Sequence, residues 1–105
     1  MIITVDLSGP EGVVDLDDPS DCNRFHLSAR GGRDEARLAA ALTASGVGRI
    51  DGDDALIEVD AIRRMAEGRV APAWADDFDR MLAYAKTKGW LHGDAIQAHV
   101  EWDTP

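Results

Sequence analysis

The spacing of apolar residues changes at Gly89, and this change constrains the fold more than any other feature of the sequence. Before it, apolar side chains in Pro72–Lys88 recur at the 3.6-residue interval of an amphipathic helix. They are Trp74, Phe78, Met81, Leu82 and Ala85. After it, apolar and polar residues alternate, as in a half-buried strand. Gly89 can adopt the left-handed conformation that ends a helix, so we predict a long helix over Pro72–Lys88.

The segment after Gly89 is predicted to be a β-hairpin over Trp90–Trp102. Gly93-Asp94 can form its two-residue turn. The alternating apolar residues of its second strand are Ile96, Ala98, Val100 and Trp102. In this register Leu91 faces Ile96 on the inner side of the hairpin.

Two shorter helices and a strand are predicted ahead of the long helix. The helices cover Asp34–Ser45 and Asp60–Glu67, and each begins with an aspartate that can cap it. Ala55–Val59 alternates as a strand does, although its apolar residues also fit one continuous helix that starts at Asp54. The residues from Gly48 to Asp54 have the composition of a turn.

From about Asp34 to Trp102, the order of the predicted elements resembles that of a winged helix-turn-helix domain. This order is helix, strand, helix, turn, helix and hairpin. The run VDAIRRMAEG is similar to the junction between strand and second helix in such domains. The run MLAYAKTKGWL is similar to the end of their third helix, where it enters the wing. The resemblance implies an α+β, winged-helix-like fold, in which Pro72–Lys88 is the recognition helix and the hairpin is the wing.

The first 32 residues lie outside a minimal winged helix, and we expect them to form an N-terminal β extension. Alternating or apolar runs predict short strands at Ile3–Leu7, Val13–Leu16 and Phe25–Ala29. Three arrangements are open for these strands: they pair with the wing, they form a separate small sheet, or they mediate self-association. A chain of 105 residues has room for one modest core. We therefore expect a single domain, with the β extension over residues 1–32 and the winged-helix-like part over 33–105.

The net charge of −9 restricts the classes of partner. Nucleic-acid binding depends on Lys and Arg displacing counterions from phosphate, so nucleic acid is an unfavourable partner, as is an anionic membrane. No apolar run reaches the roughly 18–20 residues that span a bilayer, and no secretory signal is visible. Cys22 is the single cysteine, which fits a reducing cytoplasm. The excess of Arg over Lys, with abundant Ala and Gly, is typical of a GC-rich bacterial genome.

The resemblance makes DNA binding one hypothesis for the function. The residues that would contact DNA are Arg63, Arg64, Arg80 and Lys88. The exposed part of the recognition helix would also carry Asp76, Asp77 and Asp79, whose carboxylates repel phosphate. We therefore favour a solvated helix face over a DNA-reading surface.

No metal, cofactor or catalytic site is predicted. His99 and Glu101 share one face of a strand, but His92 would lie about 13 Å from His99 at ~3.3 Å per residue, too far for one ion. Cys22 lies in an acidic loop, which disfavours a reactive thiolate. None of the serines lies in a nucleophile-elbow motif, and no glycine pattern matches a dinucleotide loop.

Three hypotheses for the function follow. The first is a non-catalytic protein-interaction or dimerisation module. Three tryptophans are many for a small chain, and we interpret Trp74, Trp90 and Trp102 as core or interface residues. The stripe of the long helix, the hairpin and the N-terminal strands can together bury more surface than one small core needs, which favours an interface. Its partner would be a second copy or another protein. The second is a DNA-binding regulator of the winged-helix type. The third is a small enzyme or ligand-binding protein, with a pocket between the N-terminal strands and the long helix.

Overall fold

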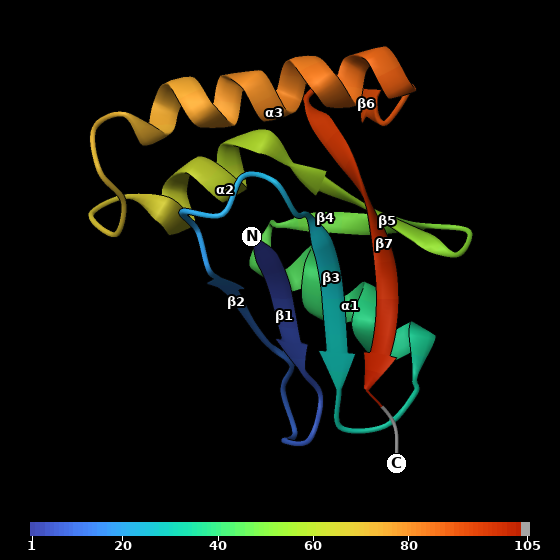
Figure 1. Cartoon of the computed structure of the whole chain (residues 1–105). Helices are drawn as coiled ribbons and strands as arrows, with labels where there is room; N and C mark the ends of the chain where they lie inside the picture. The colour runs from blue at the N-terminus through green and yellow to red at the C-terminus, as the bar shows by residue number, and fades with distance from the viewer. Residues whose placement is uncertain (104–105) are drawn as a thin grey trace.

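The computed structural model describes residues 1–103, which form seven strands and three helices (Figure 1). The strands are β1 (Ile2–Asp6), β2 (Val13–Asp17), β3 (His26–Arg30), β4 (Gly48–Asp51), β5 (Asp54–Glu58), β6 (Leu91–His92) and β7 (Ala95–Asp103). The helices are α1 (Glu35–Ser45), α2 (Val59–Ala66) and α3 (Trp74–Lys88). None of the helices in this described part is long and apolar enough to cross a bilayer.

All seven strands belong to one mixed sheet, and β7 joins its two halves. The strand order is β2-β1-β3-β7-β5-β4, and β6 pairs with the start of β7. One side of β7 pairs with antiparallel β5 from Ala95 to His99. The other side pairs with β6 at its start and with parallel β3 from His99 to Asp103. Because β7 changes neighbours along its length, the sheet curls into a half-barrel, with β4 and β5 crossing behind the other strands (Figure 1).

A single apolar core fills the inner side of the curled sheet. Alternate residues of the strands point into it, including Ile3 and Val5 of β1, Leu27 of β3 and Ile57 of β5. Each helix adds buried side chains to this same cluster. Figure 1 shows α1 behind the sheet and α3 across one end of it. The outer side of β3 and β7 remains partly exposed and polar.

The winged-helix prediction is wrong, because the predicted wing is the centre of a larger sheet. β3 lies parallel to β7 and β1 lies parallel to β3, so the N-terminal strands continue the sheet that begins with the hairpin. The predicted turn over Gly48–Asp54 is also wrong, since β4 and β5 form a second hairpin there. The chain is a sheet-rich α+β protein, and the division into an extension and a helical part is not seen in it. The backbone N–H and C=O groups on both sides of a buried strand need hydrogen-bond partners. For β7 most of these partners come from β3 and β5, which lie far from it in the sequence.

Several local predictions are confirmed. Asp34 caps α1 by accepting a hydrogen bond from the Arg37 N–H, and Gly89 ends α3 with φ of 79°. Leu91 pairs with Ile96 across the predicted turn. The ambiguous segment from Asp54 is a strand. The predicted cap at Asp60 is wrong: α2 begins at Val59, and no side chain caps it.

Candidate functional site

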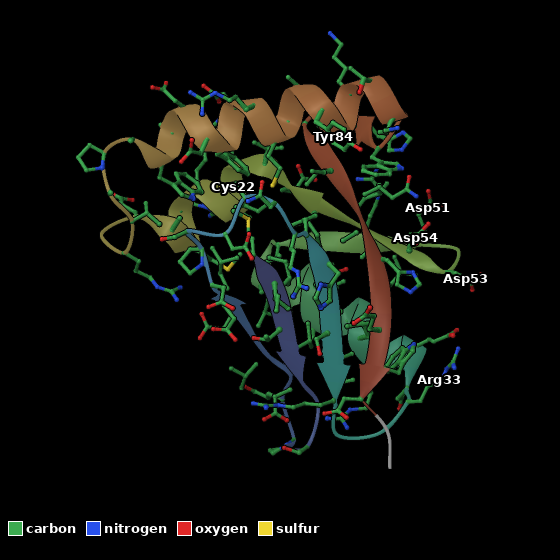
Figure 2. All side chains as sticks on the ribbon, viewed as in Figure 1. Cys22, Arg33, Asp51, Asp53, Asp54 and Tyr84 are labelled. Atoms are coloured by element: carbon green, nitrogen blue, oxygen red, sulfur yellow. The ribbon has the colours of Figure 1, made fainter. Side chains whose placement is uncertain are left out.

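A half-open cleft lies under α3, between this helix, the loop that joins β2 to β3, and the segment Trp90–Gln97. Its volume is about 630 Å³, within the range of sites that bind small molecules or side chains. Its floor is apolar and its rim is aromatic and charged. Figure 2 shows Cys22 below α3 and Tyr84 further along the same helix.

Stacked aromatic rings hold the loop of the cleft against α3. Trp74 and Phe78, one helical turn apart, stack with ring centroids 4.7 Å apart and planes 8° from parallel. The indole N–H of Trp74 donates to the Pro19 carbonyl at 2.6 Å. Both side chains are buried, so this contact sets where the loop from Pro19 to Phe25 lies relative to the helix.

Two exposed aromatic side chains form the rim of the cleft near the C-terminal end of α3. Tyr84 is 57% exposed and Trp90 is 41% exposed, and their rings meet edge to face with centroids 5.9 Å apart. Among residues 1–103, one other large hydrophobic side chain, Val13, is this exposed. The backbone of Trp90 is held at both polar groups, because its N–H donates to Ala85 and its carbonyl accepts from Gln97. The rim therefore presents apolar rings at a defined position.

The charged residues of the cleft include one arginine that is paired and one that is not. Arg80 donates to Asp77 at 2.7 Å, an exposed pair one helical turn apart. Arg24 lines the same cleft and makes no ion pair within the described residues. A guanidinium without a carboxylate partner beside exposed rings can bind an anionic group of a ligand.

Cys22 lies at the cleft, but its surroundings favour the neutral thiol. Burial raises the pKa of Cys22 above its usual value of 9.0, and the nearby Asp77 carboxylate raises it further. The thiolate is the nucleophilic form of cysteine, so this thiol is suited to packing and not to catalysis.

Alkylation of Cys22 by iodoacetamide is expected to reach half its maximal rate above pH 9.0, because the rate follows the thiolate fraction. In the urea-unfolded chain, where the thiol is solvated and Asp77 is no longer held beside it, the midpoint is expected at a lower pH. The folded state therefore holds the proton more tightly, and the unfolding free energy falls as the pH rises through the unfolded-state pKa. Asp77→Asn should lower the native midpoint. A native midpoint below that of the unfolded chain would contradict this prediction.

The three tryptophans predicted as an interface do not meet on one surface. Trp74 is a core residue, and Trp90 is exposed at the rim of the cleft. Trp102 is half-buried on β7, where the Arg33 guanidinium lies 5.6 Å from its ring centroid. Of the three, Trp90 alone is at the cleft.

The four basic residues predicted as DNA contacts are spread over α2 and α3. Arg63 donates to Asp79 at 3.1 Å and covers the Phe78 ring, while Arg80 pairs with Asp77. Lys88 lies over the Tyr84 ring at 5.5 Å, and Arg64 is exposed. Carboxylates of α3 therefore neutralise two of the four. The structural premise for DNA reading, a recognition helix followed by a wing, is removed with the winged-helix fold.

The histidines lie on strands of one sheet but do not form a metal site. Register places His26 beside His99, and each has a carboxylate neighbour: Glu101 is 3.4 Å from His26 and Asp54 is 3.8 Å from His99. His92 contacts Gln97 instead, at 3.1 Å. No set of three His, Cys, Asp or Glu residues in the described chain is arranged to hold a metal ion. The position of His26 beside His99 could not be predicted from the sequence, because no local pattern indicates that β3 pairs with β7.

Residues Arg24, Phe25 and Tyr84 of the cleft were also missed. Tyr84 carries a weak signal, since it is an aromatic residue outside the apolar stripe of its own helix. The predicted pocket lies between the N-terminal strands and the long helix, whereas the N-terminal part contributes to this cleft only the loop from Ser20 to Phe25, between β2 and β3. No protein-family model, curated protein or solved structure matches this chain. The chain is a sheet-rich α+β protein with a half-open cleft under α3.

Proposed function

We propose that this protein is a non-catalytic binding module that takes a segment of another protein into the cleft under α3. The observation that carries the proposal is the pair of exposed rings, Tyr84 and Trp90, at the rim of a half-open cleft that also contains Arg24 and Arg80. Tryptophan, tyrosine and arginine are the residues that contribute most of the binding energy at protein interfaces.

The chemistry of the cleft indicates what it binds. Its apolar floor, formed by residues such as Met81 and Ile96, favours burial of an apolar or aromatic side chain. Arg24 favours a carboxylate next to that side chain. The protein as a whole is acidic, so Arg24 is a local source of positive charge at the cleft, where Arg80 is already paired with Asp77. A segment that combines an aromatic residue with a neighbouring acid meets both requirements.

Selection from a displayed library of random 12-residue peptides tests the proposal. We expect enriched peptides that contain an aromatic residue beside Asp or Glu. Trp90→Ala should weaken their binding at least about tenfold, because a central interface ring contributes on the order of 1.4–2 kcal/mol. Arg24→Ala should weaken the acidic peptides selectively. Lys86→Ala, an exposed change on α3 outside the cleft, is the matched control and should leave binding unchanged.

Failure to enrich any peptide, or equal binding to the Trp90→Ala protein, would overturn the proposal. Other occupants of the cleft remain as outcomes of further measurements. If the cleft takes a second copy of this chain, sedimentation at tens of micromolar will show a dimer that Trp90→Ala dissociates. If it takes a small molecule, a thermal-shift screen will show a ligand whose stabilisation is lost in the same variant.

DNA binding is the weaker alternative, since the net charge is −9 and the contacts are dispersed. A lack of retardation of duplex DNA at low salt would close it. The proposal places the protein in the cytoplasm, on the ground that its single cysteine is kept as a thiol there.

A further inference from the structure

We infer a second binding site, independent of the cleft, at which an extended basic segment adds as a strand to the free side of β7. The pairing of β7 is unequal on its two sides. On the side of β3 it continues to Asp103, whereas on the side of β5 it ends at His99, opposite Asp54. Residues Val100–Asp103 therefore have a strand on one side only, over about 13 Å at ~3.3 Å per residue.

The direction of the amides shows which backbone groups face the free side. Gln97 donates its N–H to the Trp90 carbonyl, on the side of β7 that pairs with β6 and β3. Because successive residues of a strand point their backbone groups to opposite sides, the N–H groups of Val100 and Trp102 face away from β3. Neither N–H takes part in any turn, loop or side-chain hydrogen bond within residues 1–103. The backbone carbonyl groups of an added strand can accept hydrogen bonds from both of these N–H groups.

A hollow of about 270 Å³ lies along this free edge. Apolar side chains from three elements line it, namely Leu38 of α1, Ile50 of β4, and Val100 and Trp102 of β7. These residues can receive the inward side chains of an added strand, whose outward side chains would face solvent. Two residues that line the hollow are labelled in Figure 2, Asp53 on the β4–β5 hairpin and Arg33 just before α1.

The charge of the rim selects a basic occupant. Asp53 and Glu35 line the hollow, and Asp51 and Asp54 flank the same hairpin turn. The one arginine there, Arg33, already lies 3.5 Å from Glu35, an exposed and therefore weak pair. Lysine or arginine at the outward positions of an added strand would be attracted to these carboxylates.

A second copy of this chain is a poorer occupant than a basic segment. The sheet has two edge strands that it could offer, and both carry exposed carboxylates that the acidic rim would repel: Asp51 on β4, and Asp15 and Asp17 on β2. Within one chain Arg69 already contacts this strand, donating to the Leu16 carbonyl at 2.8 Å and lying 3.7 Å from Asp15. At Val100–Asp103 the Arg33 guanidinium lies 5.6 Å from the Trp102 ring centroid, but no side chain of the described residues hydrogen-bonds to the backbone there.

Hydrogen exchange of the ¹⁵N-labelled protein, followed by NMR, tests the inference. The probe is a capped seven-residue peptide of alternating lysine and valine. In the free protein the amides of Val100 and Trp102 should exchange faster than the amide of Glu101, which faces β3 in the same strand. With peptide, the exchange of Val100 and Trp102 should slow at least about tenfold, with no change at Glu101.

Two N-methylated peptides separate strand addition from attraction by charge. One carries methyl groups on the valine amides and the other on the lysine amides, so each keeps the full positive charge. In an added strand only one of these alternate sets faces β7. One methylated peptide should therefore lose binding and the other should retain it. Equal binding of both, or no protection of Val100 and Trp102 by the unmodified peptide, would overturn the inference.

Protein variants provide the remaining controls. Asp53→Asn should raise the peptide Kd about two- to fivefold at low salt, as expected for loss of one exposed charge pair. Asp60→Asn, an exposed change on α2 that does not line the hollow, should leave it unchanged. Trp90→Ala should also leave it unchanged, so failure here and failure of the cleft proposal are distinguishable. Dimer formation by the unliganded protein that protects Val100 and Trp102 would identify a second copy as the occupant and overturn the basic-segment proposal.

Discussion

Replacing Gly31 with alanine is expected to lower the free energy of unfolding by about 3 kcal/mol or more. Gly31 follows β3 with φ of 98°, a conformation that alanine rarely adopts. Its added Cβ would also lie 2.3 Å from the Ser8 nitrogen and 2.7 Å from the Leu7 carbonyl carbon. Both atoms are backbone, and Leu7 is tied to the end of β3 by its N–H, which donates to Arg30 at 2.8 Å. The clash therefore cannot be relieved by a side-chain movement.

The neighbouring glycine is a matched control for the Gly31 prediction. Gly32 has φ of 108°, but a Cβ there would meet no atom within 4 Å. Gly32→Ala should therefore cost only the backbone strain, about 1 kcal/mol. Urea titration followed by tryptophan fluorescence measures both variants. Equal destabilisation by the two changes would contradict the close approach of the ends of β1 and β3.

Replacing Phe78 with alanine is expected to lower the unfolding free energy by about 3–5 kcal/mol, the usual cost of removing a buried phenylalanine. Phe78 is fully buried, stacks on Trp74 and is covered by the Arg63 guanidinium, whose central carbon lies 4.9 Å from the ring centroid. The cavity would form where α3 and the cleft loop meet. We therefore expect the cleft to lose its shape together with the stability of the protein.

Tyr84→Ala is the matched control on the same helix, because it also deletes an aromatic ring. Tyr84 is 57% exposed, so the change should cost less than ~1 kcal/mol. Calorimetric melting of both variants gives the comparison. A Phe78→Ala protein as stable as Tyr84→Ala would contradict the placement of α3 against the core. A folded Tyr84→Ala protein also makes this ring available for testing in peptide binding.

Local features of the sequence were sufficient to predict those parts of the structure whose stabilising interactions come from residues close together in the chain. Asp34 caps the helix that follows it, and Gly89 ends α3, as their sequence contexts predict. The turn at Gly93-Asp94 sets the pairing of Leu91 with Ile96 within a few residues. Each of these structures depends on hydrogen bonds or backbone conformations that span at most one turn of chain, so the sequence pattern records them.

The fold could not be predicted in the same way, because the partners of β7 lie far from it in the sequence. The alternation of its residues specifies which side chains are buried but not which strand accepts its backbone hydrogen bonds. The pairing of His26 with His99 illustrates this, since nothing near either residue indicates the other. β4 was missed for a related reason. Its four residues, Gly48–Asp51, include a glycine and two charged residues, and they form a strand because β5 pairs with them.

The sequence by itself determined the kind and approximate limits of most helices and strands, since periodicity, caps and turns act over a few residues. Only the tertiary structure decided the strand order, and with it the cleft under α3 and the free edge of β7. Both bring together segments that lie far apart in the sequence. Long-range pairing depends on which surfaces pack best in three dimensions, and no local pattern of residue types contains that choice.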